Sequence, residues 1–205
     1  MANIPRLVGA PDFGKLVAPE ESLGKRLEGK RVLLTGTTKG VGRVTQELLC
    51  AQGAFVCGSG RSKGVAAEVA NELVAKGYKA AGFDVDLSDY EAVKKWVADC
   101  AELMGGIDIV INNASHPGMA PFGEMTPDIW AYGIQNELDL VYNVCNCAWP
   151  YLIEAGGGSI IITSSTVGLQ GSNSPQACHA AAKGACLALA RQLAAEGGPF
   201  GIRCN

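Results

Sequence analysis

Short apolar runs alternate with longer amphipathic segments from Lys30 to the end of the chain. The apolar runs are nearly uninterrupted, which is typical of strands buried on both faces of a sheet. Strands are predicted at Val32–Thr35, Phe55–Gly58, Lys79–Asp84, Ile107–Asn112 and Ser159–Ser164, and helices at Val41–Gln52, Lys63–Lys76, Tyr90–Met104, Pro127–Ala155 and Gln176–Glu196. The alternation predicts an α/β fold with a doubly wound parallel sheet in three layers, in which helices cover both faces.

Both ends of the chain depart from this alternation. Residues 1–28 are predicted to form an N-terminal extension on the surface, with a short helix around Glu20–Leu27. Residues 29–205 form the predicted domain. Gly201–Asn205 resembles the entry into another strand, and a sheet that ended there would leave an open edge. We therefore expect the C-terminal strands of the sheet to be missing from this chain.

Composition narrows the class of protein. With 205 residues, 48% of them hydrophobic, and a formal net charge of -3, the chain suits one filled core and disfavours nucleic acid as a partner. No apolar run approaches the ~18 residues of a membrane helix, and no signal peptide is indicated. The eight cysteines lack C-x-x-C spacing, which favours free, packed thiols over a metal site or disulfides. We expect a cytoplasmic protein.

A glycine-rich turn, Thr35–Gly42, lies between the first predicted strand and the first predicted helix. Glycine lets the backbone approach a pyrophosphate closely, and the helix N-terminus presents unpaired N–H groups to its charge. This placement predicts a dinucleotide-binding site of the Rossmann type, whereas an ordinary tight turn is the alternative.

The end of the second predicted strand indicates which dinucleotide binds. Gly58–Ser62 lacks the acidic residue that would hydrogen-bond the ribose of NAD and repel an added phosphate. Arg61 and Lys39 supply two cations instead, so the sequence favours the 2′-phosphate of NADP(H). The alternative for Arg61 is a surface arginine without a ligand.

Four motifs, in this order and spacing, resemble the short-chain dehydrogenase/reductase family from about residue 30 onward. They are Thr35–Gly42, Asp86-Leu87-Ser88-Asp89, Asn112-Asn113-Ala114, and Ser165 with Lys183. The resemblance implies a Rossmann-type, NADP-dependent oxidoreductase acting on a small-molecule ketone or alcohol, assembled as a homodimer or homotetramer. It implies cofactor contacts from Gly36, Thr38, Lys39, Gly40, Val41, Gly42, Arg61, Asp86, Leu87, Asn113, Ala114 and Lys183. Asp86 would contact adenine and Asn112 would hold the central sheet and the cofactor, with a polar turn as the alternative for each.

The family's catalytic serine, tyrosine, lysine and supporting asparagine are only partly kept. Ser165 falls where the resemblance places the hydroxyl that polarises the substrate, with Ser164 and Thr166 as competitors. His179 replaces the tyrosine of the Tyr-x-x-x-Lys motif, which ends at Lys183. The i, i+4 spacing keeps both side chains on one helix face. Since imidazole, with an ordinary pKa of ~6.5, exchanges protons near neutrality, proton transfer can survive the replacement.

A carboxylate beside this pair would favour the charged form of the imidazole, whereas Lys183 disfavours it. Glu137 occupies the position of the family's asparagine, with Asn136, one residue earlier, as the alternative. Facing inward, Glu137 would pair with Lys183 or hydrogen-bond His179 and fix its tautomer. An exposed helix carboxylate is the other interpretation.

The loop after the fourth predicted strand also departs from the family pattern. Ser115 stands where glycine is usual, and His116–Phe122 is predicted to lie near the nicotinamide and form part of the substrate wall. His116 is interpreted first as a loop histidine and second as a catalyst. This loop, His179, Glu137 and the extension together resemble a family member that reduces an isoflavanone ketone, which implies a substrate such as dihydrodaidzein.

The favoured function is therefore hydride transfer from NADPH to a ketone. Ser165 would hold the carbonyl oxygen, His179 would act as general acid, Lys183 would bind the nicotinamide ribose and Glu137 would orient the pair. An isomerase or racemase, and a scaffold without catalysis, remain as alternatives. Apolar positions spaced along the helix from Pro127 fit either a subunit interface or the core of one chain: Ile134, Leu138, Val141, Cys145 and Trp149.

Overall fold

The structure, a computed structural model, describes residues 25–205. Most of the predicted extension at residues 1–28, including most of the helix expected around Glu20–Leu27, lies outside these residues. Arg26–Gly29 form a turn that leads into the first strand. No helix of the described part is long and apolar enough to cross a membrane.

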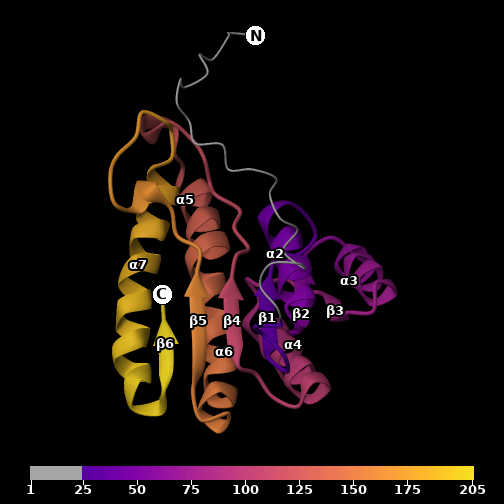
Figure 1. The fold of residues 1–205 in the computed structure, drawn as a ribbon. Coiled ribbons are helices and arrows are strands. Elements are labelled where there is room, and N and C mark those ends of the chain that lie inside the picture. Colours follow the sequence, from indigo (N-terminus) through magenta and orange to yellow (C-terminus); the bar gives the residue numbers. More distant parts are fainter. Residues whose placement is uncertain (1–24) are drawn as a thin grey trace, which may run out of the picture.

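Within residues 25–205, six parallel strands form one sheet in the order β3-β2-β1-β4-β5-β6; Figure 1 shows the sheet between its helices. The strands are β1 (Arg31–Thr35), β2 (Phe55–Gly60), β3 (Lys79–Asp84), β4 (Ile109–Asn112), β5 (Gly158–Ile162) and β6 (Ile202–Cys204). The chain moves outward from β1 in one direction and, from β4 onward, in the other. This doubly wound order confirms the predicted fold class and places a topological switch point between β1 and β4.

The helices connect successive strands. They are α2 (Gly40–Ala51), α3 (Val65–Ala75), α4 (Tyr90–Met104), α5 (Pro127–Ile134), α6 (Leu140–Glu154) and α7 (Ala177–Gly197), with short 3-10 turns at Phe122–Glu124, Thr166–Gly168 and Gly198–Phe200. Thr126 caps α5 by accepting a hydrogen bond from the N–H of Ile129, and Pro127 follows at the first helical position, as the sequence predicts.

Two apolar cores lie on opposite faces of the sheet. Leu33 of β1 packs with α4, α6 and α7, whereas its neighbours Val32 and Leu34 pack with α2 and α3. Adjacent residues of one strand point to opposite faces, so both faces are buried and the nearly unbroken apolar runs are explained. All eight cysteines are buried and free of disulfides.

Four of the five apolar positions that fitted either an interface or a core pack in the core, whereas Ile134 is only half-buried. Val141 and Cys145 of α6 are buried, and Leu138 and Trp149 pack against the same cluster. These side chains are therefore used within the chain.

The helix predicted as one segment, Pro127–Ala155, is divided. Gln135–Asp139 form a π-helical turn between α5 and α6. A π turn adds one residue to a helical turn and shifts the register of the helix beyond it, while the apolar spacing on either side continues. The sequence pattern therefore does not reveal this interruption.

Arg31 and Asp108 join the starts of β1 and β4. The Asp108 carboxylate accepts hydrogen bonds from Arg31 Nε at 2.9 Å and Nη2 at 2.8 Å, and a third from the Arg31 backbone N–H at 2.9 Å. These bonds from Arg31, above all that of its side chain, lower the pKa of Asp108. Since the folded pKa lies below the unfolded value of about 3.9, the stabilisation is complete above that pH and is lost as pH falls through the folded pKa.

Asp108→Asn is expected to lower the free energy of unfolding at pH 7 by about 1–2 kcal/mol, because the guanidinium loses its charged partner. The loss should shrink in acid, because protonation of the wild-type carboxylate progressively removes the same charged partner. Urea unfolding at pH 7 and pH 3 measures both values. Asp99→Asn is the control, because Asp99 pairs with Lys95 on the exposed side of α4 and should change stability by less than about 0.5 kcal/mol. Equal losses for the two variants would contradict the assignment.

Candidate active site

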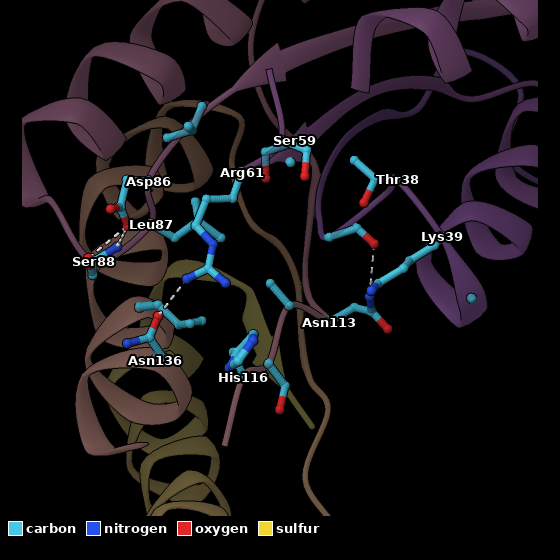
Figure 2. A pocket seen from close by; sticks show the side chains of 18 residues that line it. Thr38, Lys39, Ser59, Arg61, Asp86, Leu87, Ser88, Asn113, His116 and Asn136 are labelled. Carbon is cyan, nitrogen blue, oxygen red and sulfur yellow. Dashed lines mark hydrogen bonds between the residues drawn. The ribbon is translucent and has the colours of Figure 1, made fainter. Parts of the chain in front are cut away.

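A cavity of about 440 Å³ lies at the carboxyl ends of the strands, around the switch point between β1 and β4. Its walls come from the loops that follow β1, β2, β3 and β4, and Figure 2 shows Arg61, Asp86 and Asn113 around it. Of the predicted cofactor residues, Gly36, Thr38, Lys39, Gly40, Arg61, Asp86, Leu87, Asn113 and Ala114 line this cavity, whereas Val41, Gly42 and Lys183 do not. Most of the predicted set is thus brought together.

The glycine turn packs too tightly for side chains. Gly36 has a φ of +75°, and a Cβ added there would lie 3.0 Å from Ala114 Cα. A Cβ on Gly42 would lie 2.0 Å from the Gly36 carbonyl oxygen, so Gly42 acts in packing behind the cavity. The following helix α2 starts without a capping side chain and without an acidic residue in its first turn. Its free N–H groups therefore suit a phosphate group.

Thr35 anchors the loop after β4 to the glycine turn. Its buried hydroxyl oxygen accepts hydrogen bonds from the backbone N–H groups of Asn113 and Ala114, both at 2.9 Å. The Asn113 side chain returns a bond to the Thr35 carbonyl at 3.1 Å. Sequence reasoning missed this role, although a polar residue at the end of a buried strand was the available signal. Asn112 instead points into the core, where its amide donates to Cys145 Sγ at 3.3 Å.

Charged side chains lie in the part of the cavity that the loops after β2 and β3 form. Asp86 accepts hydrogen bonds from the backbone N–H of Ser88 at 3.0 Å and from its hydroxyl at 2.7 Å. These bonds lower the pKa of Asp86, so it stays ionised. Arg61 reaches toward Asn136, with Nη1 at 3.3 Å from Oδ1, as Figure 2 shows. Arg61 is thus the cation aimed into this part of the cavity.

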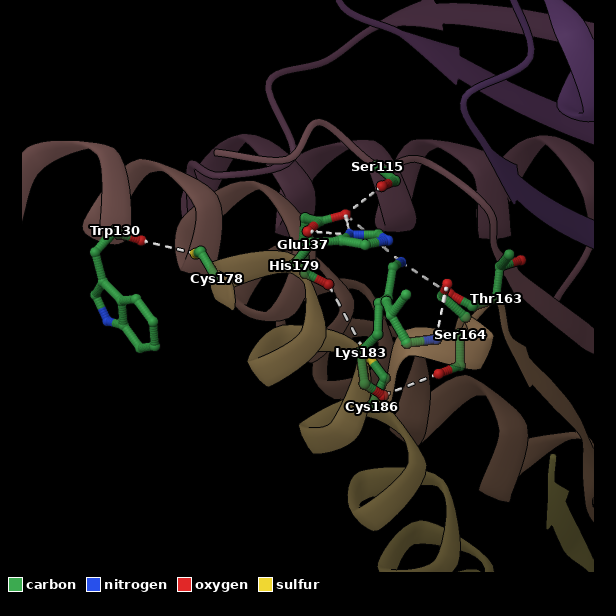
Figure 3. Close-up of polar contacts among 11 residues, drawn as sticks. Ser115, Trp130, Glu137, Thr163, Ser164, Cys178, His179, Lys183 and Cys186 are labelled. Atoms are coloured by element: carbon green, nitrogen blue, oxygen red, sulfur yellow. Dashed lines mark hydrogen bonds and ion pairs between the residues drawn. The ribbon is translucent and has the colours of Figure 1, made fainter. Parts of the chain in front are cut away.

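A buried carboxylate, Glu137, lies beside the cavity. Figure 3 shows His179 directed at it: Nδ1 is 2.9 Å from Oε1 and 2.7 Å from Oε2. Ser115 donates its hydroxyl proton to Oε1 at 2.5 Å, and Lys183 Nζ lies 3.9 Å from the same oxygen. Glu137 is fully buried, so the alternative interpretation as an exposed helix carboxylate is wrong. Hydrogen-bond donors from Ser115 and His179 and the nearby ammonium group of Lys183 stabilise the carboxylate.

Asn136 and Glu137 are adjacent in the π turn, and their side chains serve different places. Asn136 and Glu137 are both buried within it. Asn136 lines the cavity and binds Arg61, while its amide donates to the Tyr132 carbonyl at 2.9 Å. Glu137 points to His179. The geometry therefore distinguishes the two: Glu137 lies with His179 and Lys183, and Asn136 lies at the cavity. Such turns recur at functional sites.

The Glu137 contact fixes the imidazole of His179. An ionised carboxylate only accepts hydrogen bonds, so Nδ1 carries the hydrogen of this contact. Nε2 is then left for a ligand, accepting a proton when the ring is neutral and donating one when it is charged. Lys183 is held separately, because Nζ donates to the Thr163 carbonyl at 2.9 Å.

Ser164 and Ser165 differ in how their hydroxyls are engaged. Ser164 donates to the Lys183 backbone carbonyl at 2.9 Å, which ties the end of β5 to α7. Ser165 Oγ only accepts a bond, from the Val167 N–H at 3.5 Å, so its own proton is free for a ligand. Within residues 25–205, Ser165 forms no hydrogen bond to His179, Glu137 or Lys183. This pattern favours Ser165 over Ser164 for binding a carbonyl oxygen.

His116 lines the cavity, and its side chain contacts Tyr132. Its Nδ1 is 3.0 Å from the Tyr132 hydroxyl, and the two rings meet edge to face. It makes no contact with the Glu137 carboxylate within the described residues. The arrangement matches a loop histidine in the wall of the cavity.

Several known proteins are similar to this chain in sequence. The chain is 31% identical over 179 residues to the 3-oxoacyl-acyl-carrier-protein reductase FabG of Vibrio harveyi, covering 87% of this chain and 72% of the relative. It is 32% identical to a tropinone reductase homologue of Arabidopsis thaliana, over 93% of this chain and 71% of that protein. L-Rhamnose 1-dehydrogenase (NAD(P)(+)) of Azotobacter vinelandii is 29% identical, with 86% and 70% covered.

A solved structure has the same fold as this chain. A short chain dehydrogenase from Mycobacterium smegmatis superposes with a TM-score of 0.83 at 30% identity, covering 87% of this chain and 75% of that one. The family described as short chain dehydrogenase matches residues 30–205. The chain therefore belongs to the short-chain dehydrogenase family of NAD(P)-dependent oxidoreductases, which interconvert ketones and alcohols.

Proposed function

We propose that this chain is an NADPH-dependent ketone reductase in which His179 replaces the family's tyrosine as proton donor. The observation that carries the proposal is the contact of Nδ1 with both oxygens of buried Glu137, at 2.9 and 2.7 Å. It fixes the ring, supports the charged imidazolium and leaves Nε2 for the substrate.

The steps of the reaction divide among the residues of the site. The hydride for the carbonyl carbon would come from NADPH when it is bound in the cavity. Ser165 donates a hydrogen bond to the carbonyl oxygen as negative charge develops there. His179 transfers the Nε2 proton to that oxygen, which completes the alcohol. Glu137 stabilises the imidazolium, and Lys183 balances the carboxylate's charge and binds the nicotinamide ribose.

The cavity fits the nucleotide half of this cofactor. A pyrophosphate suits the tight glycine turn and the uncapped start of α2, because both offer free backbone N–H groups. Arg61 and Lys39 line the cavity and would pair with a 2′-phosphate, while Asp86 would accept a hydrogen bond from adenine. The acidic residue that suits NAD is missing after β2.

For the substrate we propose an isoflavanone ketone such as dihydrodaidzein. The sequence resembles dihydrodaidzein reductase at His179, Glu137 and the His116–Phe122 loop. The relatives from Vibrio, Azotobacter and Arabidopsis are named for different substrates. Family membership therefore does not identify the substrate of this chain, and an activity assay is needed. In this proposal the protein is cytoplasmic and forms a homodimer or homotetramer.

His179→Ala is expected to lower turnover with a ketone substrate at least ~100-fold, because the general acid is removed. The loss of NADPH absorbance on adding dihydrodaidzein, or a panel of aromatic and aliphatic ketones, measures turnover. Binding of NADPH to the variant should be unchanged, which shows that it is folded. An unimpaired variant would remove histidine from the mechanism, and substrate conversion without NADPH loss would favour an isomerase.

Arg61→Ala is expected to raise KM for NADPH about 10–100-fold and leave KM for NADH nearly unchanged, because only the 2′-phosphate loses a charged partner. Steady-state kinetics with each cofactor give both values. Arg191→Ala serves as the matched control, since Arg191 is exposed on α7, and should alter neither. Parallel increases for NADPH and NADH would refute the role of Arg61 in discrimination.

A further inference from the structure

Ser115 lies at the boundary between the cofactor cavity and the buried carboxylate. It lines the cavity, and its hydroxyl donates to Glu137 Oε1 at 2.5 Å, as Figure 3 shows. The sequence has serine here at a position where the family usually has glycine, which carries no hydroxyl. Two departures from the family pattern, Ser115 in place of glycine and His179 in place of tyrosine, therefore both contact Glu137.

The Glu137 carboxylate needs this donor. Oε2 is bound by His179, whereas Oε1 is shared between His179 at 2.9 Å, Ser115 at 2.5 Å and Lys183 at 3.9 Å. Without Ser115, Oε1 would keep only a shared bond and a distant ammonium group. A fully buried carboxylate that lacks hydrogen bonds is unfavourable in its charged form. Ser115 thus stabilises the form of Glu137 that holds an imidazolium.

The direction of the Ser115 side chain is fixed by the backbone on both sides. The N–H of Ala114 donates to Thr35 Oγ1 at 2.9 Å, and the N–H of His116 donates to the Asn136 carbonyl at 3.2 Å. The loop is therefore tied to β1 on one side and to the π turn on the other. Because the hydroxyl proton is committed to Glu137, Ser115 acts through the carboxylate.

We propose that Ser115 is a positioning residue for the proton donor, holding the ionised Glu137 carboxylate against His179 Nδ1. This inference rests on the proposed function, since it assigns Ser115 to the same proton transfer. It makes the active site a chain of contacts that runs from the cofactor loop through Ser115 and Glu137 to His179. Replacing Ser115 should then weaken turnover only while Glu137 is present to receive its bond.

A double-mutant cycle tests this dependence with full-length protein, NADPH and dihydrodaidzein. Ser115→Ala is expected to lower kcat about 10-fold, and Glu137→Gln at least about 100-fold. The double variant should lie within about 2-fold of Glu137→Gln, because the bond that Ser115 makes has already lost its charged acceptor. Ser115→Thr keeps the hydroxyl and should stay within about 3-fold of the wild type.

Ser164→Ala is the matched control. It also removes a hydroxyl near the site, but that hydroxyl binds the Lys183 backbone carbonyl. The factor by which Ser164→Ala lowers kcat should be the same in the wild type and in the Glu137→Gln variant, because the two side chains act independently. NADPH binding to each variant confirms folding, and Ser115→Gly replaces the alanine variant in the cycle if that protein does not fold.

The outcomes separate this inference from the proposed function. If Ser115→Ala lowers kcat by the same factor with and without Glu137, or leaves kcat at the wild-type value while Glu137→Gln is impaired, the positioning role is overturned alone. If Glu137→Gln itself keeps full turnover, the proposed proton donor and the role of Ser115 both fall. Dependence on Glu137, together with retention in Ser115→Thr, supports the inference.

Discussion

The site depends on one buried negative charge. Glu137 has no exposed surface, and an ionised carboxylate in that position is stable only with well-placed donors. Those donors come from the loop after β4, through Ser115, and from α7, through His179 and Lys183. The carboxylate therefore links segments that are distant in the sequence, and the position of each depends on the others.

The fold brings these segments together because of its winding. β1 and β4 are neighbours at the switch point, so the loops at their carboxyl ends share one cavity. Thr35 ties those loops to each other, and Ser164 ties β5 to α7. The cavity and the group of Glu137, His179 and Lys183 then meet at Ser115, which lines the cavity and binds Glu137. In the proposed function, this arrangement would give a hydride donor and a proton donor access to one substrate.

Much of this arrangement is predictable from simple periodicity in the sequence. Doubly buried strands, the glycine turn and the i, i+4 pair of His179 and Lys183 depend on spacing alone, which is why the fold class and the common helix face were predictable. The π turn was not, because the apolar spacing continues through Gln135–Asp139. Sequence reasoning also left Asn136 and Glu137 both open, because an error of one residue in counting along this helix exchanges the two positions. The direction of Ser115 depends on backbone bonds to Thr35 and Asn136, contacts between distant segments that no local pattern encodes.

The tautomer of His179 shows whether Glu137 holds the imidazole through Nδ1. The chain has two histidines, so long-range 1H–15N correlation NMR of histidine-labelled protein resolves both rings, and a His116→Asn variant assigns them. The account predicts that the neutral His179 ring carries its hydrogen on Nδ1, because Glu137 accepts it, and that Glu137→Gln weakens this preference. A neutral ring with its hydrogen on Nε2, unchanged in Glu137→Gln, would contradict the account.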